Sequence, residues 1–400
     1  MPKILRIHNR LIIGGPALNV LYLTKYLAPE FETLLIVGEK EDHEKDASFL
    51  AEQMGIKTVF LPDMGRSLHP YRDYKAYRKI KNIIKDFKPD IVHTHAAKPG
   101  ALGRLAASSS GVRVIVHTYH GHVFHSYFNK LKTRFIINTE RFLAKKTDAL
   151  IAISNQQKKE LTEEFKIADS DKFKTIPLGF ELDKFRENMP EKRKIFRKEF
   201  NLDDDEIAIG IIGRLVPVKN HLLFLEAIDY LKKNTHKKFR AFIIGDGETR
   251  EEIEEKAKKL GISVATSKEK DINSTLTFTS WRKDIDYVNA GLDIITLTSL
   301  NEGTPVSLIE AQAANKPIVS TRVGGISDVV IENETALLSN VNDTIGFQKN
   351  LLALVEDSNL RNSLGKNGAE HVQQKFSVER LVMDMKNLYH GLLIKKNSKR

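Results

Sequence analysis

Residues 298–310 read TSLNEGTPVSLIE, and this stretch decides the fold. The apolar, β-branched run at 293–297 precedes it and has the length of a strand, and a helical pattern continues after it through Ala313. The stretch therefore joins the carboxyl end of a strand to the amino end of a helix.

Three neighbouring residues predict where that helix begins. Thr304 suits the N-cap, Pro305 suits the first helical position because its missing N–H would be unpaired there, and Gly303 permits close backbone approach. The N–H groups of the first turn, from Val306 onward, would then face a ligand. A helix N-terminus carries roughly half a positive charge, so phosphate is the ligand that this end suits best.

Two glutamates flank the helix start. Glu302 lies just before it and Glu310 lies about two turns inside the helix. A carboxylate accepts hydrogen bonds from two hydroxyl groups at once, which suits a sugar or ribose diol beside the phosphate. The same residues would also fit an acid–base pair, or an ordinary capped helix with surface carboxylates, so the stretch alone leaves these alternatives open.

The length and composition indicate a globular protein of two domains. The 400 residues exceed the roughly 250 to 300 at which a single core stops growing. Hydrophobic residues make up 41% and charged residues 29%, and the absence of cysteine fits a reducing compartment. No apolar run reaches the roughly 18 residues of a membrane span, so we expect a cytoplasmic protein.

The net charge of +11 is unevenly distributed along the chain. Residues 1–185 contain 30 Lys and Arg against 21 Asp and Glu, a net +9, and residues 186–394 contain 29 against 31, a net −2. The tail 395–400 adds +4. Clustered cations of this kind favour an anionic partner, either nucleic acid or an acidic membrane surface, although a merely solvated basic surface is also consistent.

Strand-like runs alternate with helix-length segments in two series. The first series lies at 4–8, 33–37, 58–61, 91–95, 112–118, 150–153 and 174–178, and the second at 207–212, 241–244, 276–279, 293–298, 317–321 and 336–339. This alternation predicts an α/β protein with two doubly wound parallel sheets, whose ligands bind at the carboxyl ends of the strands. The charged segment 181–206 suggests the boundary between the two series.

We therefore expect three regions. Residues 1–185 would form one domain and residues 186–375 a second, with their strand ends facing one cleft. After Phe376, residues 376–400 would form a final amphipathic helix that crosses back to the first domain.

The first domain contains two candidate ligand loops. Gly14 and Gly15 follow the first strand and open a helix, which lets the backbone approach a phosphate or sugar, although they lack the third glycine of a dinucleotide fingerprint. His120 follows the fifth strand beside Gly121 and suits a polar group in a cleft. His93 and His95 share one strand face, but without further ligand spacing or cysteine we expect no metal there.

The segment 123–146 combines aromatic and basic residues. Its aromatic members include Phe124, Phe128, Phe135 and Phe142. Six Lys or Arg and only one acid, Glu140, accompany them. This composition suits an interfacial helix resting on anionic lipid, and it also suits an ordinary helix that covers the sheet.

The second domain supplies a possible diphosphate site. Gly213 and Arg214 follow its first strand, and Lys219 lies at the start of the next helix. Arginine binds a diphosphate as a planar fork and lysine as a point charge, and the pattern is not a Walker loop. Gly245, Asp246 and Gly247 end the next strand, and the segment 280–285, which includes Arg282, ends another. Backbone groups at these two ends could contact the edge of a base.

Taken together, these residues resemble the retaining glycosyltransferases of the GT-B fold, specifically family 4, also called group 1. The resemblance covers essentially the whole chain and rests on the order of the motifs just described. The segment 117–124, HTYHGHVF, is similar to the branch that assembles capsule, O-antigen and exopolysaccharide units in bacteria.

The resemblance implies a role for each position. Arg214 and Lys219 would hold and stabilise the departing diphosphate of a nucleotide sugar without a metal. The segment Gly303, Thr304, Pro305 and Val306 would bind the same phosphates, Glu310 the ribose hydroxyls and Glu302 the donor sugar.

The remaining positions complete the implied site. His120 would approach the sugar near its reacting carbon, and Gly15 would lie near the phosphates or the acceptor. The residues around Arg282 would border the base. The anomeric configuration of the sugar would be retained because the acceptor attacks from the front face, with no protein nucleophile.

Two positions depart from the family pattern. Asn315 stands where a glycine commonly follows the helix, and Ser280 stands where a glycine commonly precedes the base loop. Asparagine is the next-best residue after glycine for a left-handed helix end, so we expect both segments to keep the family conformation.

The favoured function is therefore transfer of a hexosyl or N-acetylhexosaminyl group from a nucleotide sugar, most simply a UDP-sugar, to a lipid-linked or polysaccharide acceptor. The enzyme would need no cofactor or metal, would bind no nucleic acid, and would lie on the inner face of the cell membrane. Alternatives are a sugar-nucleotide epimerase of the same fold, a glycosidase using the two glutamates, and a non-enzymatic basic protein that binds membrane or nucleic acid.

Overall fold

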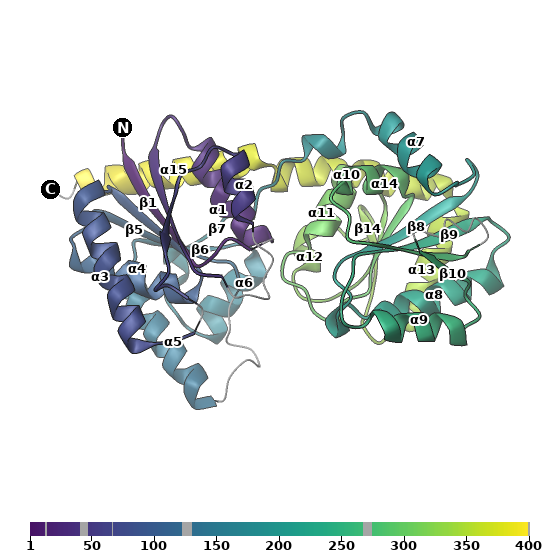
Figure 1. The fold of residues 1–400 in the computed structure, drawn as a ribbon, viewed down its shortest axis with the longest axis horizontal. Coiled ribbons are helices and arrows are strands. Elements are labelled where there is room, and N and C mark those ends of the chain that lie inside the picture. The colour runs from purple at the N-terminus through teal and green to yellow at the C-terminus, as the bar shows by residue number, and fades with distance from the viewer. Residues whose placement is uncertain (13, 41–46, 66, 122–129, 267–273, 399–400) are drawn as a thin grey trace. The chain divides into compact units, whose positions relative to one another are not determined.

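A computed structural model shows two α/β units (Figure 1). It describes the chain except for residues 13, 41–46, 66, 122–129, 267–273 and 399–400. Residues Met1–Phe180 and Phe376–Arg400 form the first unit, and Glu181–Lys375 form the second. His122, Phe124 and Phe128, which belong to the segments 117–124 and 123–146 discussed above, lie outside the described residues.

The first unit is built on a parallel sheet. Within the described residues it has seven strands in the order β3-β2-β1-β4-β5-β6-β7. The strands are β1 (Lys3–His8), β2 (Glu32–Gly38), β3 (Thr58–Leu61), β4 (Ile91–His95), β5 (Val114–Tyr119), β6 (Ala149–Ala152) and β7 (Phe173–Thr175). The order reverses between β1 and β4, so the carboxyl ends of these strands form the expected ligand-binding edge.

Helices cover both faces of this sheet. They are α1 (Gly15–Tyr26), α2 (Ser48–Gln53), α3 (Pro70–Phe87), α4 (Ala97–Ser109), α5 (Lys130–Lys145), α6 (Asn155–Lys159) and α15 (Val378–Asn397). Residues of β1 alternate between the faces, so Ile4 packs with α1 and α15, while Leu5 and Ile7 pack with α3 and α4. Helix α15 therefore completes the core of the first unit, beside α1 (Figure 1).

The second unit repeats this architecture. Within the described residues its parallel sheet has seven strands in the order β10-β11-β9-β8-β12-β13-β14. The strands are β8 (Ile207–Ile212), β9 (Phe239–Ile244), β10 (Val264–Thr266), β11 (Leu276–Ser280), β12 (Ile294–Leu297), β13 (Ile318–Thr321) and β14 (Ala336–Ser339). The helices are α7 (Met189–Glu199), α8 (His221–Asn234), α9 (Arg250–Lys259), α10 (Ile285–Gly291), α11 (Val306–Ala313), α12 (Ile326–Val329), α13 (Thr344–Glu356) and α14 (Ser358–Phe376).

The predicted α/β fold with two doubly wound parallel sheets is confirmed. The predicted strands are present with their ends shifted by a few residues, and the final helix extends to Asn397. Strand β10 was not predicted, because three residues at a sheet edge, one of them the exposed Val264, give almost no periodic signal. Asn315 has φ 56°, as expected for an asparagine that ends a helix in the left-handed conformation.

Candidate functional site

Two loops at the carboxyl edge of the second sheet are fastened to each other. One follows β8 and contains the short 3₁₀ helix Pro217–Lys219, and the other follows β12. The Thr298 hydroxyl donates to the Lys219 carbonyl oxygen (2.8 Å), and the Leu300 N–H donates to the Val218 carbonyl oxygen (2.8 Å). These hydrogen bonds hold the Lys219 backbone beside the stretch 298–310.

Helix α11 begins one residue later than predicted. Pro305, rather than Thr304, occupies the N-cap, with φ −72° and ψ 98°, and no side chain caps the helix. A proline at the cap has no hydroxyl to offer to the first turn, which explains the missing cap bond. The N–H groups of Val306 and Ser307 consequently have no acceptor among the described residues. The described residues thus leave these N–H groups unpaired at the helix end that was predicted to bind an anion.

A second glycine pair supports this loop. Gly325 N–H donates to the Glu302 carbonyl oxygen (3.0 Å), and a Cβ at Gly325 would overlap the carbonyl oxygen of Gly303. Gly324 has φ 47°, which an L side chain adopts only with strain. At Gly303, by contrast, a Cβ would meet nothing within 4 Å. The sequence analysis missed the pair 324–325, although two glycines just after the strand ending at Thr321 were a usable signal.

Lys219 and Glu302 form an ion pair. The Lys219 ammonium lies 2.5 Å from Glu302 Oε1, and the Ser299 hydroxyl donates to the same oxygen (2.6 Å). Oε2 of Glu302 has no hydrogen-bond partner among the described residues. Arg214 is exposed and has no ion pair in the described part of the chain. Two groups predicted to act on different parts of a donor therefore contact each other, while Arg214 is available to an anion.

The glycines that follow β8 and β9 bring these two loops into close contact. Gly245 has φ 142°, and a Cβ there would overlap the carbonyl oxygen of Gly213. A Cβ at Gly247 would overlap the Leu215 carbonyl oxygen in the same way. Asp246 accepts hydrogen bonds from the Ser280 hydroxyl (2.7 Å) and from Gly247 N–H (2.9 Å), and these bonds lower the pKa of its carboxyl. Asp246 therefore joins the ends of β9 and β11.

The Arg282 guanidinium is already held by two carboxylates. It contacts Glu199 at 2.5 and 2.9 Å and Asp284 at 2.5 and 2.9 Å, and these hydrogen bonds raise its pKa. Its side chain consequently acts as an anchor for the loop after β11, and not as an open hydrogen-bond donor. Ser280, just before it, has φ 57°, the conformation in which the family pattern commonly has glycine. Trp281 beside it is 50% exposed.

Glu310 lies half-buried on α11, and the pKa of its carboxyl is raised. Burial raises the pKa of its carboxyl to about 7, the nearby Lys184 opposes this shift, and Asp286 adds to it. The carboxylate therefore gains and loses its proton near neutral pH, which sets when it can accept hydrogen bonds from two hydroxyl groups.

The carboxyl edge of the first sheet holds the other predicted residues. Gly14 is the N-cap of α1 with no side-chain cap, Gly15 is the first residue of that helix, and a Cβ at Gly14 would contact only Pro16. His120 follows β5 directly, and its Nε2 lies 2.9 Å from His95 Nδ1. The predicted residues of this unit thus lie at the ends of β1 and β5, which flank β4 in the sheet.

His93 and His95 share one face of β4, as their spacing predicted, and their ring centroids are 4.1 Å apart. Both are buried and hydrogen-bond within the protein, to Arg6, Thr118, Tyr389 and His120. Among the described residues there is no group of three His, Cys, Asp or Glu side chains that could hold a metal ion.

Both halves of the chain match models of glycosyltransferase families. Residues 13–184 match the model described as Glycosyltransferase Family 4, and residues 192–371 match the model described as Glycosyl transferases group 1.

Named relatives of similar length extend this match. The chain is 30% identical over 342 residues, 85% of each protein, to the Escherichia coli UDP-Gal:alpha-D-GlcNAc-diphosphoundecaprenol alpha-1,3-galactosyltransferase. It is 24% identical over 337 residues to the Staphylococcus aureus capsular polysaccharide biosynthesis glycosyltransferase CapM, covering 82% of this chain and 84% of CapM. Among solved structures, Anabaena HepE in complex with UDP superimposes with a TM-score of 0.80 at 18% identity, over 97% of this chain and 100% of HepE.

The two Rossmann-like sheets and their glycine-lined loops are therefore those of a glycosyltransferase with the GT-B fold. More specifically, the chain belongs to glycosyltransferase family 4, group 1, and the resemblance seen in the sequence is confirmed.

Alanine substitutions at two glycines separate ligand binding from folding. We expect Gly303→Ala to leave the unfolding temperature nearly unchanged, because the added Cβ meets no protein atom, but to weaken UDP binding by obstructing the phosphate approach. Gly325→Ala should lower the unfolding temperature, because its Cβ overlaps a backbone oxygen. Thermal unfolding and calorimetric titration with UDP measure both effects. Equal loss of stability in the two variants would contradict this assignment.

The acidity of Glu310 predicts a pH dependence of nucleotide binding. The resemblance implies that Glu310 binds the ribose hydroxyls, and only an ionised carboxylate accepts from both, so we expect UDP affinity to rise as pH increases through about 7. A single group with this pKa changes its ionised fraction roughly tenfold between pH 6 and pH 8. Glu310→Gln should remove this component and leave only the titration of the UDP phosphate. An unchanged profile in the variant would exclude Glu310 from the ribose site.

Proposed function

We propose that this glycosyltransferase moves a hexosyl or N-acetylhexosaminyl group from a UDP-sugar to a lipid-linked or glycan acceptor, with retention of anomeric configuration. The carrying observation is the cradle at the carboxyl edge of the second sheet. There Arg214 and the uncapped end of α11 have no anionic partner among the described residues, and Lys219 is paired with Glu302. The UDP in the HepE complex and the UDP-galactose in the name of the Escherichia coli relative support the choice of nucleotide. The diphosphoundecaprenol in the latter name supports a lipid-linked acceptor.

Leaving-group stabilisation is the chemistry that this cradle suits. As the bond between the sugar's anomeric carbon and the diphosphate breaks, negative charge grows on the phosphate oxygens. Arg214, the Lys219 ammonium and the N–H groups of Val306 and Ser307 would stabilise that charge, and no metal is then required. The acceptor hydroxyl oxygen bonds the same carbon from the face that the diphosphate leaves, and its proton passes to the departing phosphate.

The ion pair between Lys219 and Glu302 organises the cradle. Each group lowers the cost of keeping the other partly buried while no donor is bound. A donor that offers phosphate to Lys219 and sugar hydroxyls to Glu302 satisfies both groups at once. This coupling favours transfer over glycoside hydrolysis, because a glycosidase would need Glu302 as a free acid, base or nucleophile.

The surface of α5 supports contact with anionic lipid. Leu143 and Ala144 are buried in the core of the first unit, while Phe135 and Phe142 are 68% and 52% exposed. Glu140, the acid noted in the sequence, is buried and binds Arg104 (2.8 and 2.9 Å). The helix thus covers the sheet and also exposes aromatic and basic groups, and this exposed surface supports the proposed contact with lipid.

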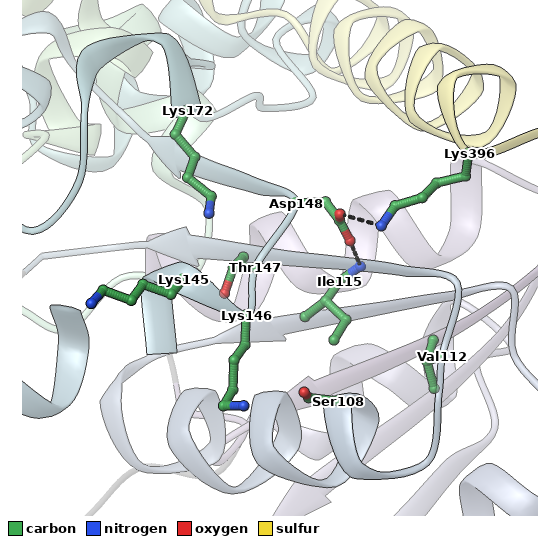
Figure 2. A pocket seen from close by; sticks show the side chains of 9 residues that line it. All are labelled: Ser108, Val112, Ile115, Lys145, Lys146, Thr147, Asp148, Lys172 and Lys396. Atoms are coloured by element: carbon green, nitrogen blue, oxygen red, sulfur yellow. Dashed lines mark hydrogen bonds and ion pairs between the residues drawn. The ribbon is translucent and has the colours of Figure 1, made fainter. Parts of the chain in front are cut away.

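A basic pocket adjoins the carboxyl end of α5 (Figure 2). It has a volume of about 350 Å³ and lies at the amino edge of the first sheet, lined by Ser108, Val112, Ile115, Lys145, Lys146, Thr147, Asp148, Lys172 and Lys396. The carboxylate of Asp148 already binds Lys396 (2.7 Å) and Ile115 N–H (2.8 Å). Burial lowers the pKa of Lys172, which has no ion pair among the described residues. This surplus of ammonium groups suits lipid phosphate, and no described helix is long and apolar enough to cross a bilayer.

Replacement of Lys219 tests the catalytic proposal. With the nucleotide sugar that best protects the protein against thermal unfolding as donor, we expect Lys219→Ala to reduce transfer roughly 100-fold or more. Lys258→Ala, at an exposed position of α9, is the matched control and should transfer normally. The wild-type rate should be the same in EDTA. Near-normal transfer by Lys219→Ala would exclude its role, and loss of the wild-type rate in EDTA with rescue by Mg²⁺ would exclude the metal-free mechanism.

Vesicle binding tests the membrane proposal. The protein should sediment with vesicles that contain phosphatidylglycerol, and salt should release it. The triple variant Lys145→Gln, Lys146→Gln and Lys172→Gln should bind at least about tenfold more weakly, because each lysine near the surface contributes about 1 kcal/mol.

The control variant carries the same change in net charge on the second unit. Lys258→Gln and Lys259→Gln on α9, combined with Lys349→Gln on α13, remove three exposed lysines. This variant should bind the vesicles normally. Equal weakening in both triple variants, or equal binding to phosphatidylcholine vesicles, would show that the pocket has no specific part in membrane contact.

A further inference from the structure

An arginine without a counter-ion lies at the centre of the first unit. Arg6 is fully buried in β1, and in the described part of the chain it forms no ion pair. Its Nη1 contacts His93 Nδ1 at 3.0 Å, His95 Nε2 at 3.4 Å and the Tyr389 hydroxyl at 3.4 Å. A buried cation among neutral polar groups is costly, so this arrangement needs a physical explanation beyond packing.

The guanidinium determines which histidine nitrogens carry protons. Arginine has five N–H donors and no acceptor, so a ring nitrogen that hydrogen-bonds to it must present a lone pair. His93 therefore accepts at Nδ1 and, when neutral, carries its proton on Nε2, which lies 2.8 Å from the Thr118 hydroxyl. The Tyr389 hydroxyl, 2.6 Å from His93 Nδ1, donates to the same lone pair. His95 likewise accepts at Nε2 and carries its proton on Nδ1.

The same alternation of accepting and protonated ring nitrogens continues from His95 to His120. His95 Nδ1–H lies 2.9 Å from His120 Nε2, so His120 accepts at Nε2 and, when neutral, carries its own proton on Nδ1. Burial and the charge of Arg6 hold the pKa of His93 and His95 well below the usual value. Burial and the neighbouring His8 lower the pKa of His120 to about 3. Each of these rings therefore has a single proton at neutral pH.

The opposite arrangement is physically unfavourable. If His120 carried its proton on Nε2, His95 would have to accept at Nδ1 and would place an Nε2–H against the Arg6 guanidinium. Two buried donors would then face each other without an acceptor, and each would keep the full cost of its desolvation. His8, whose ring centroid is 6.3 Å from that of His120, has no bond to it that would reverse the preference.

We propose that Arg6 and His95 are positioning residues that hold His120 as a neutral hydrogen-bond donor, with its proton on Nδ1. His120 Nδ1 is buried and has no hydrogen-bond partner among the described residues, so the protein leaves its N–H unsatisfied and an oxygen acceptor would satisfy it. A sugar hydroxyl, ring oxygen or phosphate oxygen fits this donor. His120 cannot remove a proton from an acceptor hydroxyl through Nδ1, because that nitrogen has no lone pair in this tautomer.

The identity of the oxygen that His120 meets rests on the proposed function, but the tautomer does not. It can be measured in the full-length protein without substrate, by ¹H–¹⁵N multiple-bond correlation spectra of protein labelled with ¹⁵N-histidine. His120→Asn identifies the His120 signals by their loss. We expect Nδ1 of His120 to be protonated and Nε2 unprotonated from pH 5.5 to 8. A proton on Nε2, or an imidazolium at pH 7, would overturn the proposal.

Substitutions at Arg6 test the cause of this preference. Arg6→Lys keeps a donor-only cation and should preserve the His120 tautomer, whereas Arg6→Met should produce a mixture of tautomers. His117, buried in β5 and hydrogen-bonded to the Thr94 hydroxyl (2.8 Å), is the internal control and should be unchanged. An unchanged His120 tautomer in Arg6→Met would exclude Arg6 as its cause. If Arg6→Met does not fold, His95→Leu serves as the second variant. It removes the Nδ1–H that His120 Nε2 accepts and should give the same mixture of His120 tautomers.

Kinetics then connect the tautomer to transfer. Once a donor and acceptor are known, Arg6→Met should lower kcat by up to roughly tenfold with little change in donor KM, as expected for one misdirected hydrogen bond, and Arg6→Lys should recover it. Equal kcat in Arg6→Met and wild type, together with a changed tautomer, would show that the donor role of His120 is not used in catalysis. Absence of any transfer by the wild-type protein would refute the proposed function and leave the spectroscopic result standing.

Discussion

The hydrogen bonds between the β8 and β12 loops are the constraint on which the second unit's site depends. The Thr298 hydroxyl and the Leu300 N–H both bind carbonyl oxygens of the 3₁₀ helix that ends at Lys219. Because Lys219 in turn binds Glu302, the anion-binding end of α11 and the lysine cannot move apart independently. Gly325 supports the same loop from the β13 side, since only a glycine fits against the Gly303 backbone. A few short contacts thereby preorganise the charges that the proposed mechanism needs.

The architecture was predictable because its signals are periodic and repeated. Apolar runs of strand length alternate with helix-length segments twice along the chain, and parallel strands bring all their carboxyl ends to one edge of each sheet. The loop residues were predictable for a related reason. Gly213 and Gly245 directly follow strands, and Gly303 lies just before the start of α11, where close backbone approach has an obvious structural use.

Other features were beyond prediction because they depend on residues far apart in sequence. The Lys219–Glu302 pair joins positions 83 residues apart, and Tyr389 meets His93 across 296 residues. The Thr304 cap prediction was wrong by one residue, since the backbone of Pro305 takes the cap conformation itself. The residues around Arg282 were predicted to border a base, yet Glu199 and Asp284 both bind its guanidinium, and Glu199 lies on α7, 83 residues away in sequence. Charge alone does not indicate whether a side chain is available to a ligand.

The buried histidines also determine how the protein responds to acid. His8, His93, His95, His117 and His120, all in the first unit, have lowered pKa values, and in the second unit this holds among the described residues for His221 and His371. An unfolded chain protonates histidine near pH 6.5, while these folded groups resist protonation until pH falls further, to about 4 for His8 and about 3 for His120. Below pH 6.5 the unfolded state therefore binds more protons, and the free energy of unfolding decreases as pH falls. The histidine network that orients His120 thus adds to the loss of stability of the first unit as pH falls below 6.5.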